Sequence, residues 1–232
     1  MAKKVNKTEE QLANVEENLS KAGLFVVDNQ EKIVKILGLI VVIIAIFALY
    51  TKFIVEPKEK EASEEMYIAE FYFQNNDYNK ALNGDGQYSG FLTVADNYSS
   101  TKSGNLANYY SAICQMNLAP NDSINYYEDA LNSLSDFDTD DEILYSLSTG
   151  LKGDANLELG NYEKALNYYV SAANDYVNDF TTPYFMMKQA FVHELNEDYN
   201  SALKIYESIK VKYSQSKEGL SIDKYISSAS NR

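Results

Sequence analysis

Small residues recur along this 232-residue chain at a nearly constant interval. They are Ala81, Ser123, Ala165 and Ala202, with spacings of 42, 42 and 37 residues. Each opens a short amphipathic stretch, and in the last three copies a tyrosine follows four positions later: Tyr127, Tyr169 and Tyr206. Such a period predicts stacked helix pairs, because one small pair cannot bury its apolar face alone.

The third copy, residues 153–172, has the clearest pattern. Large apolar side chains recur there at three- and four-residue spacings, which gives each of two helices one apolar face. Gly160 and Asn161 separate the two helices. Small residues stand where the helices must approach closely. The rest of the chain is expected to supply neighbours of the same kind.

These positions resemble the tetratricopeptide repeat family over about residues 62–214. The signature residues are Gly153, Gly160, Tyr162, Ala165, Tyr169 and Ala172 in the third copy, and Ala190, Tyr199, Ala202 and Tyr206 in the fourth. The resemblance implies an all-α solenoid of about four helix pairs, closed by a capping helix over about Lys217 to Ser228. The chain departs from the family pattern at Pro120 and Ile209, and an interruption at 83–86 divides the second helix of the first pair.

An apolar segment precedes the repeats, from Ile33 to Val55, and its stretch 36–50 has no charged residue. Roughly 20–23 helical residues span about 30–35 Å, enough to cross a bilayer. We expect an uncleaved transmembrane helix. A cleaved signal peptide is the alternative, but about 32 residues precede the segment and no small-residue cleavage site follows. Flanking lysines are balanced and leave the orientation open: Lys21, Lys32 and Lys35 before it, Lys52, Lys58 and Lys60 after it.

The sequence thus predicts four segments. Residues 1–32 form a polar tail, in which Thr8 and Gln11 favour a capped helix over 8–20; this helix lies on the membrane surface, or the tail is loosely ordered. Residues 33–55 span the membrane. The repeat domain follows over 56–214, and residues 215–232 form the capping helix and tail.

Charge and cysteine content exclude several classes of protein. The net charge is -14, and residues 56–232 carry 13 basic against 28 acidic side chains. An acidic domain disfavours nucleic-acid binding, which needs clustered positive charge. Cys114 is the sole cysteine, which excludes an intramolecular disulfide or a zinc site built on several cysteines. We expect it to be a small buried apolar residue.

No catalytic set is evident. His193 is the sole histidine and lies within a predicted helix, where we expect a structural role. Residues 136–142 superficially resemble a calcium loop, but Asp141 replaces the required glycine and Leu147 the required glutamate. We expect Thr139 or Asp140 to cap the helix that begins near Asp141. No enzyme activity, cofactor, metal or small-molecule substrate is predicted.

Binding of other proteins is the class of function that remains. In a repeat solenoid the first helices of successive pairs line a concave face. If the family geometry holds, the partner-binding residues are Tyr67, Glu70, Phe73, Tyr109, Met116, Leu151, Asp154, Glu158, Tyr184, Lys188 and Phe191. We expect fewer than half of the aromatic residues to touch a partner. The carboxylates on this face favour apolar or basic segments over acidic tails.

The layout of tail, membrane helix and repeats resembles the YfgM-like family of ancillary Sec translocon subunits and membrane-anchored repeat proteins of Bacteroidota. This resemblance implies a single-pass protein of the bacterial inner membrane with a periplasmic repeat domain. Its partners would be translocon subunits, exported chains or periplasmic chaperones, and residues 33–55 would contact lipid. The alternative is a structural scaffold in another cell-envelope complex, such as a secretion, gliding or division apparatus.

Overall fold

Helices are the regular secondary structure in the part of the chain that the structure, a computed structural model, describes: residues 27–120 and 124–232. No β-strand occurs in these ranges. The helix predicted over 8–20, most of the tail 1–32, and Ser123 lie outside the described residues. The chain divides into two compact units, Met1–Pro57 and Lys58–Arg232.

The first unit contains one long apolar helix. α2 (Gln30–Tyr50) has no charged side chain after Lys35, and none of its residues is buried. Within the described ranges, α2 supplies the apolar part of the one helical segment that is long and apolar enough to cross a membrane. A continuous apolar surface of this kind needs lipid or another apolar surface to cover it.

A wider helical turn follows α2. Thr51–Val55 (η1) is π-helical, and the Glu56 N–H donates to the carbonyl of Thr51, five residues earlier. Pro57 explains this turn, because proline has no N–H for the Phe53 carbonyl and its ring would press against that oxygen in an ordinary helix. The π-turn widens the backbone at this point and gives the ring room.

The second unit opens with a helix pair whose second member is in two pieces. The bounds are α3 (Glu56–Gln74), which belongs to this unit from Lys58 on, α4 (Tyr78–Asn83) and α5 (Phe91–Asn97). Ala62, Met66 and Ala69 lie at helical spacings on α3 and are buried against α4, α5 and the following helix. The interruption predicted at 83–86 extends to Gly90, and Gly84 begins it with φ of +83°.

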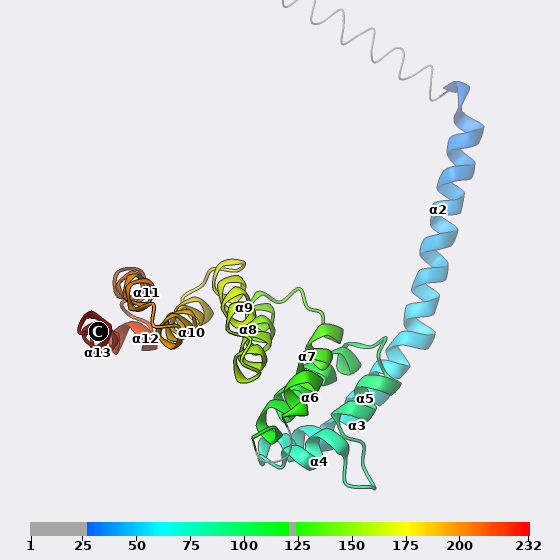
Figure 1. Cartoon of the computed structure of the whole chain (residues 1–232). Helices are drawn as coiled ribbons and strands as arrows, with labels where there is room; N and C mark the ends of the chain where they lie inside the picture. Colours follow the sequence, from blue (N-terminus) through cyan, green and yellow to red (C-terminus); the bar gives the residue numbers. More distant parts are fainter. Residues whose placement is uncertain (1–26, 121–123) are drawn as a thin grey trace, which may run out of the picture. The chain divides into compact units, whose positions relative to one another are not determined.

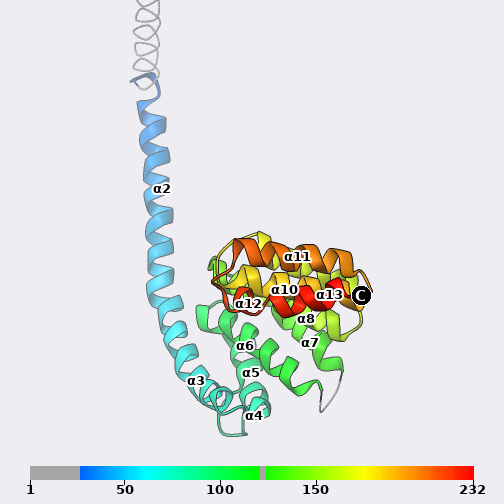
Figure 2. The same ribbon diagram turned by 90° about the vertical axis from the view of Figure 1, so that its left-hand side faces the viewer.

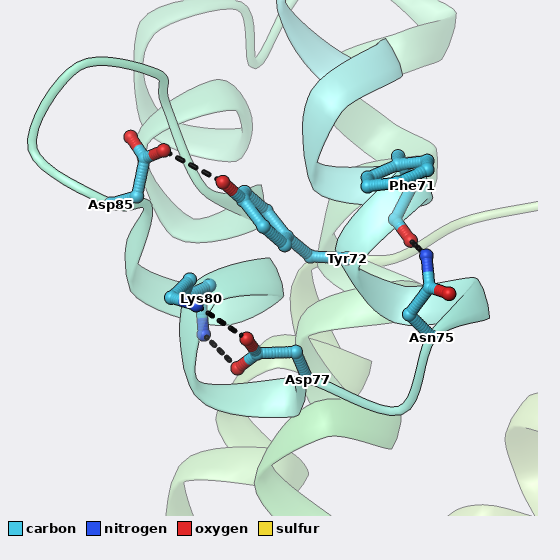
Figure 3. A network of polar contacts seen from close by, with 6 residues as sticks. All are labelled: Phe71, Tyr72, Asn75, Asp77, Lys80 and Asp85. Atoms are coloured by element: carbon cyan, nitrogen blue, oxygen red, sulfur yellow. Dashed lines mark hydrogen bonds and ion pairs between the residues drawn. The ribbon is translucent and has the colours of Figure 1, made fainter.

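Asp85 holds this interrupting loop against α3. Its carboxylate accepts hydrogen bonds from the backbone N–H groups of Gln87 and Tyr88 at 2.9 and 2.8 Å. It also accepts one from the Tyr72 hydroxyl of α3 at 2.7 Å, which Figure 3 shows beside the Asp77–Lys80 pair. The Tyr72 hydroxyl and these backbone donors lower the pKa of Asp85 to about 2. The loop is therefore fixed to α3 by a carboxylate that stays ionised.

Three uninterrupted helix pairs and a short C-terminal pair complete the unit. Their bounds are α6 (Lys102–Leu118) with α7 (Asn125–Asp136), α8 (Glu142–Glu158) with α9 (Tyr162–Asn174), α10 (Thr181–Leu195) with α11 (Tyr199–Lys212), and α12 (Lys217–Leu220) with α13 (Asp223–Ser230). Each of α6 to α11 packs against the next helix in the chain, and α12 and α13 pack against α11 (Figures 1 and 2). This chain-order stacking is the predicted solenoid.

The recurring small residues let the helices approach. Ala81, Ala165 and Ala202 have no exposed surface. A Cβ added to Gly153 would lie 2.5 Å from a ring carbon of Tyr169, so α8 carries a glycine where the α9 ring lies against its backbone. Gly160 has φ of +76°, which the turn between these two helices requires. The third copy is thus organised by packing.

Two local predictions were wrong. The capping helix expected over Lys217–Ser228 is divided into two helices. The Ser221 N–H donates a hydrogen bond to the Glu218 carbonyl, three residues earlier, and this turn ends α12. The N-cap of α8 is Asp141, not Thr139 or Asp140: its carboxylate accepts from the N–H groups of Ile143 and Leu144 at 3.0 and 2.8 Å. Thr139 acts one step earlier, accepting from the Asp141 N–H at 3.1 Å.

Candidate functional site

The predicted partner-binding residues differ widely in exposure. Those that are exposed are Tyr67, Glu158, Tyr184 and Phe191; those that are half-buried are Glu70, Phe73, Met116, Leu151, Asp154 and Lys188; Tyr109 is buried. They come from α3, α6, α8 and α10, the first helices of the four pairs. Exposure separates Tyr184 and Phe191 of the late repeats from Phe73 and Tyr109 of the early ones.

Aromatic residues of the first two pairs pack inside the domain. Phe73 meets the rings of Phe91 and Tyr110, with centroids 6.1 and 5.1 Å apart. Tyr109 lies 5.3 Å from Phe137 in the core between α6 and α7. Tyr67 is the contrast, with 66% of its surface exposed. In this half, the rings of Phe73 and Tyr109 hold helices together, and we leave both out of the proposed binding surface.

Met116 and Leu151 also pack on core clusters, Met116 against the α6–α7 core and Leu151 on the same cluster from α8. Glu70 is half-buried on α3, and burial raises the pKa of its carboxyl. These three side chains therefore present only part of their surface to solvent.

A polar network joins α8, α9 and α10. The Lys188 ammonium lies 2.7 Å from the Asp154 carboxylate, which also accepts a hydrogen bond of 2.6 Å from the Tyr169 hydroxyl. The ammonium lies over the rings of Tyr169 and Tyr184, at 5.6 and 5.2 Å from their centroids. Burial alone would lower the pKa of Lys188, but Asp154 outweighs it and the pKa is raised. Two charges expected to meet a partner thus neutralise each other.

Carboxylates on the first helices also serve buried tyrosines of the second helices. Besides Asp154 with Tyr169, Glu158 interacts with Tyr127 and Glu194 with Tyr206, close enough to raise the pKa of each hydroxyl after burial has done so. In the first pair the Tyr98 hydroxyl lies 3.4 Å from Glu65. Burial, together with these carboxylates, raises the pKa of each tyrosine, that of Tyr98 to about 12. The predicted binding carboxylates Asp154 and Glu158 therefore also have structural partners.

An open groove remains at the C-terminal repeats. One lobe, about 350 Å³, is lined by α10 residues Tyr184, Lys188 and Phe191, with Tyr225 of α13 on its far side. A second lobe, about 340 Å³, is lined by Leu147, Phe180 and Tyr184. Tyr184, Lys217 and Glu218 belong to both lobes. We name this continuous hollow the α10 groove.

Exposed aromatic surface gathers in the α10 groove. Phe180, Tyr184 and Phe191 expose 69, 43 and 48% of their surface. Sequence reasoning named Tyr184, Lys188 and Phe191 but missed Phe180 and the wall formed by α12 and α13. Phe180 precedes α10, so a search restricted to helices passes over it. The wall depends on how the last two helices fold back, which no local pattern encodes.

The described residues show no constellation for chemistry. No group of three or more His, Cys, Asp or Glu side chains in these ranges could hold a metal ion. Cys114 is buried, and burial raises the pKa of its thiol to about 12. His193 contacts Asp198, Nδ1 to Oδ2 at 3.3 Å, at the turn between α10 and α11. Cys114 therefore belongs to the core, and His193 belongs to the turn that joins α10 to α11.

Neither a family model nor a curated protein matches the chain. Among solved structures, the chain is similar to the nearly identical TPR-like repeats assigned to a kinesin light chain of Podospora anserina. The TM-score is 0.54 at 13% identity, over 75% of this chain and 86% of that one. The fold is that of a tetratricopeptide-like repeat array. This confirms the predicted all-α repeat fold.

Proposed function

We propose that this chain is a membrane-anchored protein-binding module that holds partner segments in the α10 groove. The observation that carries the proposal is the gathering of Phe180, Tyr184 and Phe191, exposed, around one hollow. Exposed aromatic side chains in a concave, partly desolvated setting are frequent anchors at protein interfaces. In the early repeats, the rings of Phe73 and Tyr109 are covered, whereas Tyr67 is exposed.

The charges around the groove favour an apolar partner segment. Lys188 is paired with Asp154, so these two charges are already satisfied, and Glu194 interacts with the buried Tyr206. The other charged residues of the groove are Asp179, Lys217 and Glu218, of which the last two are adjacent and opposite in sign. Of the apolar or basic segments expected from the sequence, we therefore propose an extended, mainly apolar segment, as in unfolded chains.

The membrane anchor would keep the binding groove close to the membrane. A repeat domain tethered by residues 33–55 would sample partners at high effective concentration near the membrane. We propose, from the resemblance in layout, an accessory of the Sec translocon in the bacterial inner membrane. Its repeat domain would face the periplasm and contact exported chains, translocon subunits or periplasmic chaperones. A scaffold subunit of another envelope complex is the alternative, distinguished by a stable stoichiometric complex on purification.

In-cell photo-crosslinking tests the groove. A crosslinking amino acid at Phe191 is expected to capture other proteins, identified by mass spectrometry, whereas one at exposed Val170 of α9 is not. Tyr184→Ala with Phe191→Ala should reduce capture from Phe180 at least about tenfold, since hot-spot aromatics cost roughly 2 kcal/mol or more. Tyr88→Ala with Tyr162→Ala removes two exposed rings elsewhere and is the matched control. Equal capture by both double variants would refute the proposal.

Orientation has its own test. Protease added to spheroplasts should digest the repeat domain if it is periplasmic, and should leave it intact otherwise. Sequencing the protected fragment shows whether residues 1–57 or residues 58–232 lie on the cytoplasmic side of the membrane.

A further inference from the structure

Two hollows of opposite charge flank α7. The first, which we name the acidic hollow, lies between α5 and α7, measures about 720 Å³ and contains Asp96, Asp129 and Asp136. No basic residue lines it. The second, the basic hollow, lies between α7 and α9, measures about 510 Å³ and contains Lys152 and Lys164. No acidic residue lines it, in a chain of net charge -14.

These five charges have no ion-pair partner. Within residues 27–120 and 124–232, the ion pairs involve other side chains. Lys152 is half-buried, and this burial lowers the pKa of its ammonium, so the structure offers it little compensation. Charges left unpaired in hollows of one sign favour a ligand of the other sign. Each hollow is thus complementary to the other.

The geometry of α7 relates the two hollows. Asp129, Ser133 and Asp136 line the acidic hollow from one flank of α7, whereas Leu131 and Ser135 line the basic hollow from its other flank. The exposed back of α7 is therefore a ridge between two grooves. α9 forms the next ridge, and it carries Lys164 and Asn167, both exposed.

We propose that a second copy of this chain docks on this face, related by a two-fold axis. Across the contact, the helices of one copy in the order α5, α7, α9 would face those of the other copy in the order α9, α7, α5. The α9 ridge of each copy then enters the acidic hollow of the other, and the α7 ridges fill the basic hollows, as ridges fit into grooves between packed helices. Lys164 of one copy meets Asp129 of the other, twice per dimer, because a two-fold contact is self-complementary.

This inference does not rest on the proposed function. The ridges of the docking face are second helices of the pairs, with α6 and α8 at the bottom of the two hollows, whereas the α10 groove is built mainly from α10, α12 and α13, so both surfaces can be occupied together. Dimerisation would present two grooves on one assembly and raise avidity for a long partner.

Charge reversal in the full chain, in detergent, tests the dimer by sedimentation-velocity ultracentrifugation over a range of protein concentrations. The wild type should associate reversibly and more weakly as salt rises. Lys164→Glu and Asp129→Lys should each raise the dimer dissociation constant about 100-fold, since each places two like-charged contacts in the interface. The matched controls are Lys204→Glu and Glu207→Lys, both exposed on α11.

Mixing the two reversed variants should restore association. In the mixed dimer, the glutamate introduced at position 164 faces the lysine introduced at position 129, so their charges are again opposite. At the other contact, the native Lys164 faces the native Asp129. Each variant alone lacks both of these pairings, so recovery in the mixture shows that position 164 of one copy faces position 129 of the other, and an assembly that stops at two copies shows the two-fold arrangement.

Several outcomes would overturn the proposal. A wild-type monomer at about 100 μM would do so, as would reversals that leave association unchanged or a mixture that fails to restore it. Open chains growing beyond two copies would refute the two-fold arrangement. At a concentration at which the wild type is monomeric, thermal unfolding of each variant should match the wild type, because the changed residues are exposed. A lower midpoint of both variants and of neither control under that condition would also count against specific docking.

Discussion

Two aromatic residues of the early repeats differ in their surroundings from two of the late repeats. In α3 and α6, Phe73 and Tyr109 are enclosed by other rings, whereas Tyr184 and Phe191 of α10 stand exposed. The early repeats are packed through rings, such as Phe91 stacked on Tyr110 at 5.1 Å. Position within a repeat therefore does not decide what an aromatic residue does.

The difference follows from how closely the helices approach. Gly150 and Gly153 of α8 bring its backbone against the rings of Phe185 and Tyr169, so one ring from each neighbouring helix fills the core. The first pair has an interrupted second helix, and several rings fill the space around it. The core around α8 and α9 therefore contains fewer rings than the core of the first pair.

The largest expected effect contrasts the two kinds of ring. Phe73→Ala should lower the free energy of unfolding by about 3 kcal/mol, because it leaves a cavity among three rings. Phe191→Ala should lower it by less than about 1 kcal/mol, because that ring is half exposed. Urea unfolding followed by circular dichroism measures both, and equal losses would remove the contrast between the halves.

An intermediate effect concerns the polar network of the late repeats. Lys188→Met should cost about 1–2 kcal/mol, because it leaves the Asp154 carboxylate partly buried with only Tyr169 as a partner. Adding Asp154→Asn should recover part of that loss. Additive losses in this double-mutant cycle would show that the two charges do not act as a pair.

The smallest effect concerns the Asp85 loop of the early repeats. The pKa of Asp85 in the folded chain is depressed to about 2, below the value of about 3.9 expected in the unfolded chain. The ionised carboxylate therefore contributes its full share of the free energy of unfolding at pH values above about 4. This contribution is lost as pH falls from about 4 toward 2. The stability difference between wild type and Asp85→Asn should therefore shrink over that window. An unchanged difference between about pH 6 and about pH 2.5 would show that the carboxylate is not held in solution.

Much of the fold could be predicted, because packing is local in a solenoid. The period of Ala81, Ala165 and Ala202 encodes contacts between consecutive helices, and all three are buried as such a contact requires. The interruption after Asn83 was visible as a glycine-rich break. The C-terminal cap was misjudged, because its division at Ser221 depends on a backbone turn rather than on periodicity.

The candidate site was less predictable. Facing direction on a helix can be inferred from spacing, but Asp154 and Lys188 come from different helices, and their pairing depends on tertiary distance. The predicted acidic groove is therefore neutral at this point. Tyr184 and Phe191 could be named from their position alone, and whether a partner contacts them stays a prediction.

The tyrosine–carboxylate pairs impose an order on the repeats. Tyr169 and Tyr206 find their carboxylates, Asp154 and Glu194, within their own helix pair, whereas Tyr127 of the second pair depends on Glu158 of the third. The third and fourth pairs, which the Asp154–Lys188 ion pair also joins to each other, could be transplanted together with these contacts intact. An array that ended at the second pair would leave Tyr127 without the carboxylate of Glu158 beside it. The joints on both sides of the third pair therefore carry a polar contact that a cut would remove.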